Sequence, residues 1–94
     1  MRQAQLTVEL TTAFRKDYKL AMKRGLDINL LDAVIEMLAM RKVLPKRCKD
    51  HDLMGNWKGY CECHVSSDWL LIYRIEAEVL VLTLFHTGTL QRLI

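Results

Sequence analysis

The N-terminal half of the chain changes from an alternating to a helical pattern of apolar residues. Residues 6–10 alternate between apolar and polar side chains, which is typical of a short strand. Apolar residues then recur at helical spacing over residues 14–22 and 31–38. Gly25 separates the two stretches, and Pro45 excludes any helical continuation beyond it. The pattern therefore predicts a strand followed by a helical hairpin.

Three further strands are predicted in the C-terminal half, over residues 60–65, 69–74 and 79–86. The stretch 79–86 is almost entirely apolar, so we expect it to be central and covered on both faces of the sheet. The element order β-α-α-β-β-β predicts an α+β domain, in which the helical hairpin packs on one face of a mostly antiparallel sheet. The opposite face would stay open and carry His64.

Length and composition restrict the class of protein. The 94 residues suit a single domain spanning 1–94, and 51% of them are hydrophobic, which is enough for one core. No apolar run reaches the roughly 18 residues of a membrane-spanning helix, and the N-terminus lacks a secretion signal. Three cysteines, an odd number, argue against a disulfide framework. We therefore expect a cytoplasmic protein with no membrane partner.

The net charge is only +3, but the cations are clustered. Two clusters lie in residues 15–24 and 41–49, with a single acid, Asp17, in the first and none in the second. The cationic residues are Arg15, Lys16, Lys19, Lys23 and Arg24 in the first cluster, and Arg41, Lys42, Lys46, Arg47 and Lys49 in the second. Such clusters suit a polyanion or an acidic protein, although solvated helix faces are the simpler explanation.

The candidate chemistry is concentrated in residues 49–69. Two histidines, His51 and His64, lie there among acids and lysines. Histidine exchanges protons near neutral pH, and proton exchange beside positive charge is what phosphodiester cleavage requires. Trp57 and Trp69 could stack on a base, although a core position is the favoured interpretation for both.

A zinc site is the first rival interpretation of this segment. Cys61, Cys63 and His64 form a C-x-C-H cluster, with His51 and Cys48 upstream. Structural zinc sites usually have two pairs of ligands with wider spacing. On a strand, moreover, the two thiols face one side and His64 the other. We therefore expect no metal ligands here and no cofactor.

A longer motif then becomes visible around these residues. The pattern Asp-His-x-Leu-x-Gly-x-Trp-Lys-Gly-x-x-x-x-His-Val-x-x-Asp-Trp-x-Leu-Ile-Tyr, from Asp50 to Tyr73, resembles the YafQ branch of the RelE-type bacterial toxins. The ending Phe-His-Thr-Gly-Thr, residues 85–89, also resembles that family. The resemblance extends over essentially the whole chain, and it implies the RelE-like microdomain with the same β-α-α-β-β-β order.

The resemblance also implies a function. These proteins are the toxins of type II toxin–antitoxin modules, and they cleave messenger RNA in the ribosomal A site by metal-independent acid–base catalysis. The implied partners are a cognate antitoxin, the ribosome with its mRNA, and operator DNA only through the antitoxin complex. The alternative is a non-enzymatic inhibitor similar to ParE-type toxins, which act by binding gyrase or another target.

The catalytic group of the family corresponds to His51, His64 and Asp68. Either histidine could be the general base, and Asp68 could orient a histidine or fix its tautomer. The predicted RNA contacts are Lys49, Lys58, Trp69, Arg15, Lys16, Lys19, Lys23, Arg41, Lys42, Lys46 and Arg47.

The chain departs from the family motif near its C-terminus. The family has a histidine after Thr-Gly-Thr, where this chain has Leu90, and an aromatic residue where it has Ile94. Two explanations compete: either the activity is weakened or lost, or His86 replaces the missing proton donor. His86 occupies a position where the family commonly has arginine.

Overall fold

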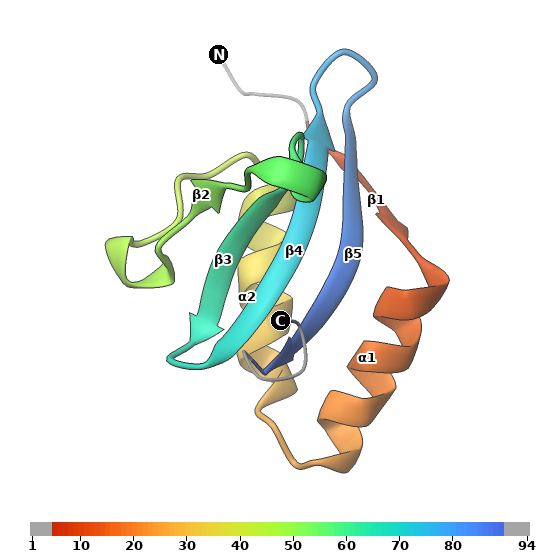
Figure 1. The fold of residues 1–94 in the computed structure, drawn as a ribbon, viewed down its shortest axis with the longest axis vertical. Coiled ribbons are helices and arrows are strands. Elements are labelled where there is room, and N and C mark those ends of the chain that lie inside the picture. Colours follow the sequence, from red (N-terminus) through yellow and green to blue (C-terminus); the bar gives the residue numbers. More distant parts are fainter. Residues whose placement is uncertain (1–4, 90–94) are drawn as a thin grey trace.

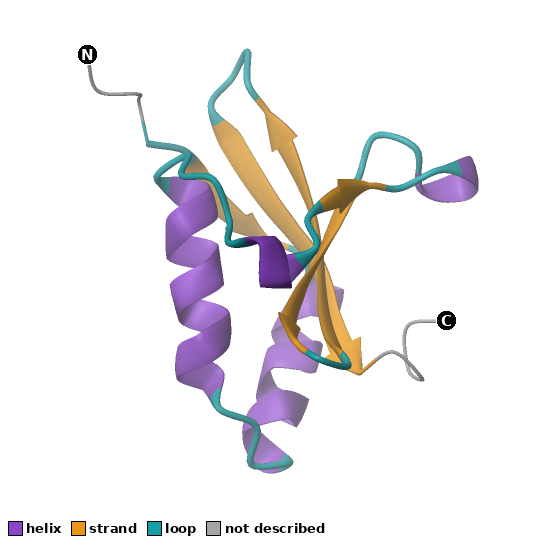
Figure 2. Ribbon diagram, turned by 90° about the vertical axis from the view of Figure 1, so that its left-hand side faces the viewer, coloured by secondary structure: helices purple, strands orange, loops and turns teal. Residues whose placement is uncertain are grey.

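Two helices lie on one face of a five-stranded sheet in the computed structural model, which describes residues 5–89 (Figure 1). In the side view of Figure 2, both helices are on the same side of the strands. The α+β architecture predicted from the sequence is therefore confirmed. The elements are β1 (Thr7–Leu10), α1 (Thr12–Lys23), α2 (Ile28–Ala39), the 3₁₀ turn η1 (Lys46–Cys48), β2 (His51–Asp52), the 3₁₀ turn η2 (Gly55–Trp57), β3 (Cys61–Ser66), β4 (Trp69–Glu76) and β5 (Val81–Thr89).

Helix α1 begins and ends at signals present in the sequence. The Thr11 side chain accepts a hydrogen bond of 3.0 Å from the backbone N–H of Phe14, which satisfies a free donor at the helix N-terminus. After the helix, Gly25 adopts a φ of +74°, and Leu26 N–H donates to the carbonyl of Ala21 at 3.1 Å. This Schellman turn reverses the chain toward α2.

Helix α2 is capped by Asp27, whose carboxylate accepts from Asn29 N–H at 3.1 Å. The helix ends at Ala39, well before Pro45, because Arg41 adopts the left-handed conformation with a φ of +59°. Glycine is the usual residue at such a position, so the sequence pattern did not indicate this stop. Both helices have twelve residues, and within residues 5–89 no helix is long and apolar enough to cross a membrane.

The strand order across the sheet is β1-β5-β4-β3-β2. Strand β1 pairs in parallel with β5, and every other pairing is antiparallel. The short strand β2 was not predicted, since two residues are too few to form an alternating pattern. It attaches His51 to the edge of β3.

The prediction that residues 79–86 are covered on both faces is wrong. In β5, buried residues alternate with half-buried ones, and Leu82 and Leu84 are the residues that enter the core. Full burial is found instead in β4, where the five residues from Trp69 to Tyr73 are all buried. Strand β4 occupies the middle of the sheet, with two strands on each side, and its first five residues are the part best protected from solvent.

Trp69 is a core residue, which confirms the favoured interpretation of this side chain and corrects its prediction as an RNA contact. Its side chain is only 2% exposed, and its indole N–H donates to Thr87 Oγ1 at 2.9 Å. The Thr87 hydroxyl donates in turn to the Leu70 carbonyl at 2.8 Å. A ring enclosed in this way has no free face on which a base could stack.

Candidate functional site

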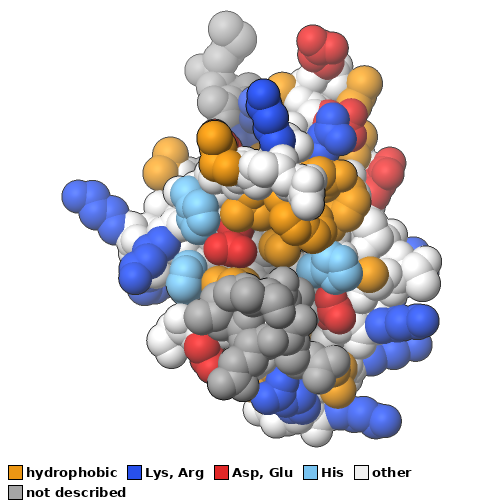
Figure 3. Space-filling view, in the orientation of Figure 1, with side chains coloured by type: hydrophobic (Ala, Val, Ile, Leu, Met, Phe, Trp, Pro, Cys, Tyr) orange, Lys and Arg blue, Asp and Glu red, His pale blue; other side chains and the backbone are white. Residues whose placement is uncertain are grey.

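A row of paired residues crosses the sheet face that the helices leave open. His51 on β2 pairs with Glu62 on β3, Glu62 with Ile72 on β4, and Ile72 with His86 on β5. Side chains of directly paired residues lie on the same face of a sheet. Figure 3 shows this face, with histidine side chains on both sides of an apolar patch. The pairing therefore brings the predicted histidines to one surface.

His64 occupies the next row of the same face. It lies two residues beyond Glu62 on β3, so its backbone is about 7 Å from that of Glu62, on the same side of the sheet. His51 is thus its diagonal neighbour. His86 is two strands away on β5, at a distance of roughly 10 Å between strand axes. The structure groups His51 with His64, and it places His86 across the face from them.

Hydrogen bonds fix which ring nitrogen each of the two neighbouring histidines can use. Nδ1 of His51 lies 2.7 Å from the Lys49 carbonyl, and Nδ1 of His64 lies 3.2 Å from the Ser67 carbonyl. A carbonyl oxygen can only accept, so each Nδ1 must carry the proton. In the neutral rings, Nε2 is therefore the basic atom.

The two basic atoms have different surroundings. Nε2 of His51 lies 3.4 Å from Glu62 Oε1, and the His51 side chain is 48% exposed. No ion pair within residues 5–89 engages Nε2 of His64. Within the described residues, therefore, a carboxylate lies beside Nε2 of His51 but not beside Nε2 of His64.

Asp68 does not orient a histidine as predicted. It is exposed in the turn between β3 and β4, and no hydrogen bond within the described part of the chain joins it to a histidine. The backbone carbonyl of Ser67 performs that role for His64. The turn contributes through its main chain, which a residue motif cannot reveal.

A basic hollow adjoins His64. It has a volume of about 400 Å³, and His64, Arg47 and Lys49 line it with the segment 65–67. Lys49 adopts a left-handed φ of +47° directly after η1, which turns the chain from the basic segment into β2. Lys49 was a predicted phosphate contact, and the structure places it next to a histidine and a second cation.

An aromatic cluster covers another part of the open face. Tyr60 makes edge-on contacts with Trp57 and Phe85, at centroid distances of 5.3 and 4.5 Å. The ring of Trp57 also meets His86 edge-on at 6.0 Å, and the Arg74 guanidinium lies 5.8 Å from the Tyr60 centroid. Trp57 is 37% exposed, so the expected core position is wrong for this tryptophan. It is the last residue of the 3₁₀ turn η2, and part of its ring is accessible to solvent.

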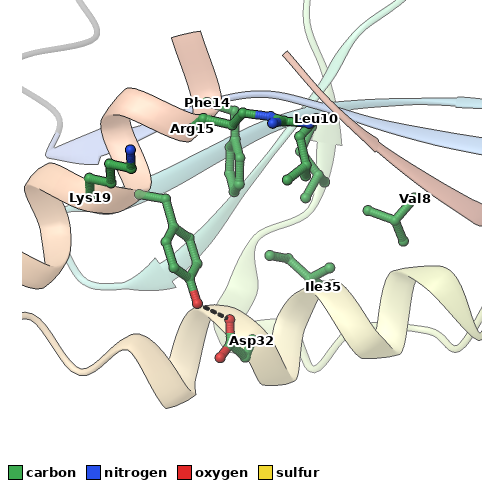
Figure 4. Close-up of a pocket in the computed structure, with 9 residues that line it drawn as sticks. Val8, Leu10, Phe14, Arg15, Lys19, Asp32 and Ile35 are labelled. Carbon is green, nitrogen blue, oxygen red and sulfur yellow. Dashed lines mark hydrogen bonds between the residues drawn. The ribbon is translucent and has the colours of Figure 1, made fainter. Parts of the chain in front are cut away.

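The basic residues of α1 belong to a different surface. Arg15 and Lys19 line a groove of about 560 Å³ between α1 and α2, together with the apolar side chains of Val8 and Ile35 (Figure 4). Lys16 and Lys23 are exposed on the same helix. None of the three histidines lines this groove. Arg15 and Lys19 therefore line a groove apart from the histidines.

The basic segment after α2 forms a further hollow of about 680 Å³, lined by Arg41, Lys42, Lys46 and Lys49. At its wall the Tyr73 hydroxyl donates a hydrogen bond to the Asp50 carboxylate. Burial, followed by this contact, raises the pKa of Tyr73. The bond anchors Asp50, the residue next to His51, to the central strand β4.

Lys58, another predicted RNA contact, is exposed directly after η2.

The cysteines have no catalytic environment. Burial, and next the hydrogen bond from the thiol to Asp52 at 3.2 Å, raise the pKa of Cys61 to about 11. Such a thiol stays protonated and weakly nucleophilic at neutral pH. Cys63 is fully buried on the helix-facing side, opposite His64. The described residues contain no group of three side chains suited to hold a metal ion.

Several neighbours of the histidines were not found from the sequence. They are Glu62 beside His51, Tyr60 and Arg74 in the aromatic cluster, and Asp17 beside His86. Strand alternation did indicate that Tyr60 and Glu62 share a face with His64. The contacts of Asp17 and Arg74 depend on long-range pairing, for which the sequence has no local signal. Leu90 and Ile94 lie outside the described residues.

Comparison with known proteins identifies the family. A family model described as "Bacterial toxin of type II toxin-antitoxin system, YafQ" matches residues 6–94. The protein named "mRNA interferase toxin YafQ" of Escherichia coli strain K12 is 42% identical over 77 residues, covering 81% of this chain and 84% of the relative.

Solved structures agree with this result. The crystal structure of YafQ from Escherichia coli strain BL21(DE3) superposes with a TM-score of 0.88 at 40% identity, covering 96% of this chain and 99% of that one. YafQ in the Escherichia coli DinJ–YafQ toxin–antitoxin complex gives a TM-score of 0.87 at 40% identity, over 96% and 98% of the two chains. None of these comparisons supports the ParE-like alternative. The family predicted from the Asp50–Tyr73 motif is confirmed: the chain belongs to the YafQ family of bacterial toxins of type II toxin–antitoxin systems.

Proposed function

We propose that this chain is an mRNA interferase that cleaves messenger RNA in the ribosomal A site by metal-independent acid–base catalysis. The observation that carries the proposal is the pair His51 and His64, neighbours on an open sheet face, with their Nδ1 atoms bound to backbone carbonyls. A basic hollow adjoins His64. The family and the name of the 42% identical relative support the same activity.

The reaction uses a nucleophile that RNA itself supplies. Nε2 of His64 removes the proton from a 2′-hydroxyl, whose oxygen attacks the adjacent phosphorus. The bond from phosphorus to the 5′-oxygen breaks, and that oxygen leaves with a proton from His86. The acid and the base must act on opposite sides of the phosphorus, which suits residues two strands apart. His51, with Glu62 beside it, stabilises the charge of the transition state.

The cations have two proposed roles. Lys49 and Arg47 in the hollow, with Lys58 beyond η2, contact phosphates next to the cleaved bond. The other predicted contacts, Arg15, Lys16, Lys19, Lys23, Arg41, Lys42 and Lys46, bind ribosomal RNA farther from it. Trp57, rather than the buried Trp69, stacks on a base of the message.

The proposed protein partner is a cognate antitoxin, because the similar YafQ of Escherichia coli has been solved in complex with the antitoxin DinJ. Binding of operator DNA is assigned to the toxin–antitoxin complex. Asp68 is exposed directly after Ser67, and its proposed role is to contact the RNA from this turn.

Primer extension on messages bound to programmed ribosomes tests the proposal. The wild-type chain should produce cuts in the A-site codon. His64→Ala should slow cleavage by about 10²-fold or more, the usual contribution of a positioned base. The matched control, Glu78→Gln, changes an exposed carboxylate in the β4–β5 turn and should cleave normally. Intact message in the presence of the wild-type chain would refute the proposed activity.

A further inference from the structure

His86 is held by a carboxylate that comes from the helical layer. Asp17 lies on α1, and its Oδ2 is 3.1 Å from Nδ1 of His86. The same oxygen accepts a hydrogen bond from the backbone N–H of Thr87 at 3.1 Å. The two side chains are 23% and 34% exposed, so the contact is partly shielded from water. This histidine therefore has a fixed partner 69 positions away in the sequence.

The backbone contact explains why the carboxylate is so placed. Strand β1 pairs with only the first part of β5, from Val81 to Leu84, so the N–H groups farther along that edge lack a strand partner. Thr11 occupies part of this edge, with its hydroxyl donating to the Phe85 carbonyl at 2.9 Å. Asp17 takes the next place by accepting from Thr87. The carboxylate is thus anchored independently of the histidine.

The contact with His86 determines the state of the ring. An ionised carboxylate has no proton to donate, so Nδ1 of His86 must be the protonated nitrogen. Nε2 is then the atom that remains for proton transfer. Trp57 meets the ring from another side, with an interplanar angle of 83°, and this contact restricts rotation of the imidazole.

We propose that Asp17 is a positioning residue for His86: it fixes the Nδ1–H tautomer and holds Nε2 ready to protonate the leaving 5′-oxygen. This inference rests on the proposed function and deepens it. In the charged ring, Nε2–H supplies the proton that the leaving oxygen takes, while Nδ1–H remains bound to the Asp17 carboxylate. Asp17, a residue of α1, thereby supports His86 on β5, across the sheet face from His51 and His64.

The tautomer can be measured on the free protein, without any RNA. Long-range ¹H–¹⁵N correlation spectra of the ¹⁵N-histidine-labelled chain, recorded where the ring is neutral, should show His86 in the Nδ1–H form. Asp17→Ala should convert it to the Nε2–H form or to a mixture. The control Asp32→Ala removes a carboxylate that accepts from the Tyr18 hydroxyl, and it should leave His86 unchanged. Wild-type His86 in the Nε2–H form would overturn the proposal.

Cleavage on programmed ribosomes supplies the second measurement. Asp17→Ala and His86→Gln should each slow cleavage, by about 10²-fold for His86→Gln, and the double variant should be no slower than His86→Gln alone. If the two losses multiply instead, Asp17 acts only on the fold and the inference is wrong. If Asp17→Ala does not fold, the wild-type spectrum and the milder Asp17→Asn variant still decide whether Asp17 fixes the tautomer of His86. An inactive wild-type chain with the expected tautomer would refute the proposed function and leave the geometry standing.

Discussion

The hydroxyl of Thr87 should be one of the most important single polar groups for stability. It is 2% exposed, accepts from the Trp69 indole and donates to the Leu70 carbonyl. Thr87→Val keeps the shape of the side chain but leaves the indole N–H buried without a partner. A buried donor left unsatisfied costs roughly 1–3 kcal/mol, so we expect a loss of about 2 kcal/mol in the free energy of unfolding.

Thr87→Ser provides the matched comparison. It keeps both hydrogen bonds and removes one buried methyl group, at a cost of about 1 kcal/mol. Urea unfolding at equilibrium measures both values. In thermal unfolding, the valine variant should melt about 8–16 °C below the wild type, since each kcal/mol shifts the melting temperature of a domain this small by about 4–8 °C. A valine variant as stable as the wild type, or more stable than the serine variant, would refute the argument.

Three further expectations concern the thiol, the cations and the C-terminal departure. The rate of alkylation of Cys61 should increase with pH up to about 11, and a rate plateau at pH 8–9 would contradict the raised pKa. The contribution of this thiol to the free energy of unfolding should be lost as the pH rises from about 9 to about 11. Replacing Lys49 and Arg47 with glutamine should weaken ribosome binding and reduce the slope of its salt dependence by up to about 2; an unchanged slope would remove both from the RNA surface. Leu90→His should raise cleavage at least about tenfold in a His86→Gln background and little in the wild type, because one proton donor suffices; no rescue would mean that the two positions are not equivalent.

The fold could be predicted from the sequence because its signals are local. Capping residues such as Thr11 and Asp27, the glycine at position 25 and the alternation in β3 each act over a few residues. The motif likewise indicated His51 and His64, and strand alternation placed the second of these on the open face. These features needed no knowledge of distant contacts.

Most of the errors have the opposite character, because they depend on contacts between distant segments. Trp69 was predicted as an RNA contact, but it is buried and bonded to Thr87 on β5, and Trp57 in η2 contacts His86 on β5 while staying partly exposed. The helix stop at Arg41 is the exception, because it is local but uses a left-handed residue other than glycine. The partnership of Asp17 with His86 joins positions 69 residues apart. Propensity and spacing carry no information on such contacts.

The chemistry of the RNA ends tests the central claim most directly. If imidazole groups activate the 2′-hydroxyl, the upstream fragment must end in a 2′,3′-cyclic phosphate or its hydrolysis product, and the downstream fragment must begin with a 5′-hydroxyl. Both ends can be determined by mass spectrometry of fragments from programmed ribosomes. Fragments with a 3′-hydroxyl and a 5′-phosphate would instead show attack by water, and would contradict the roles assigned to His64 and His86.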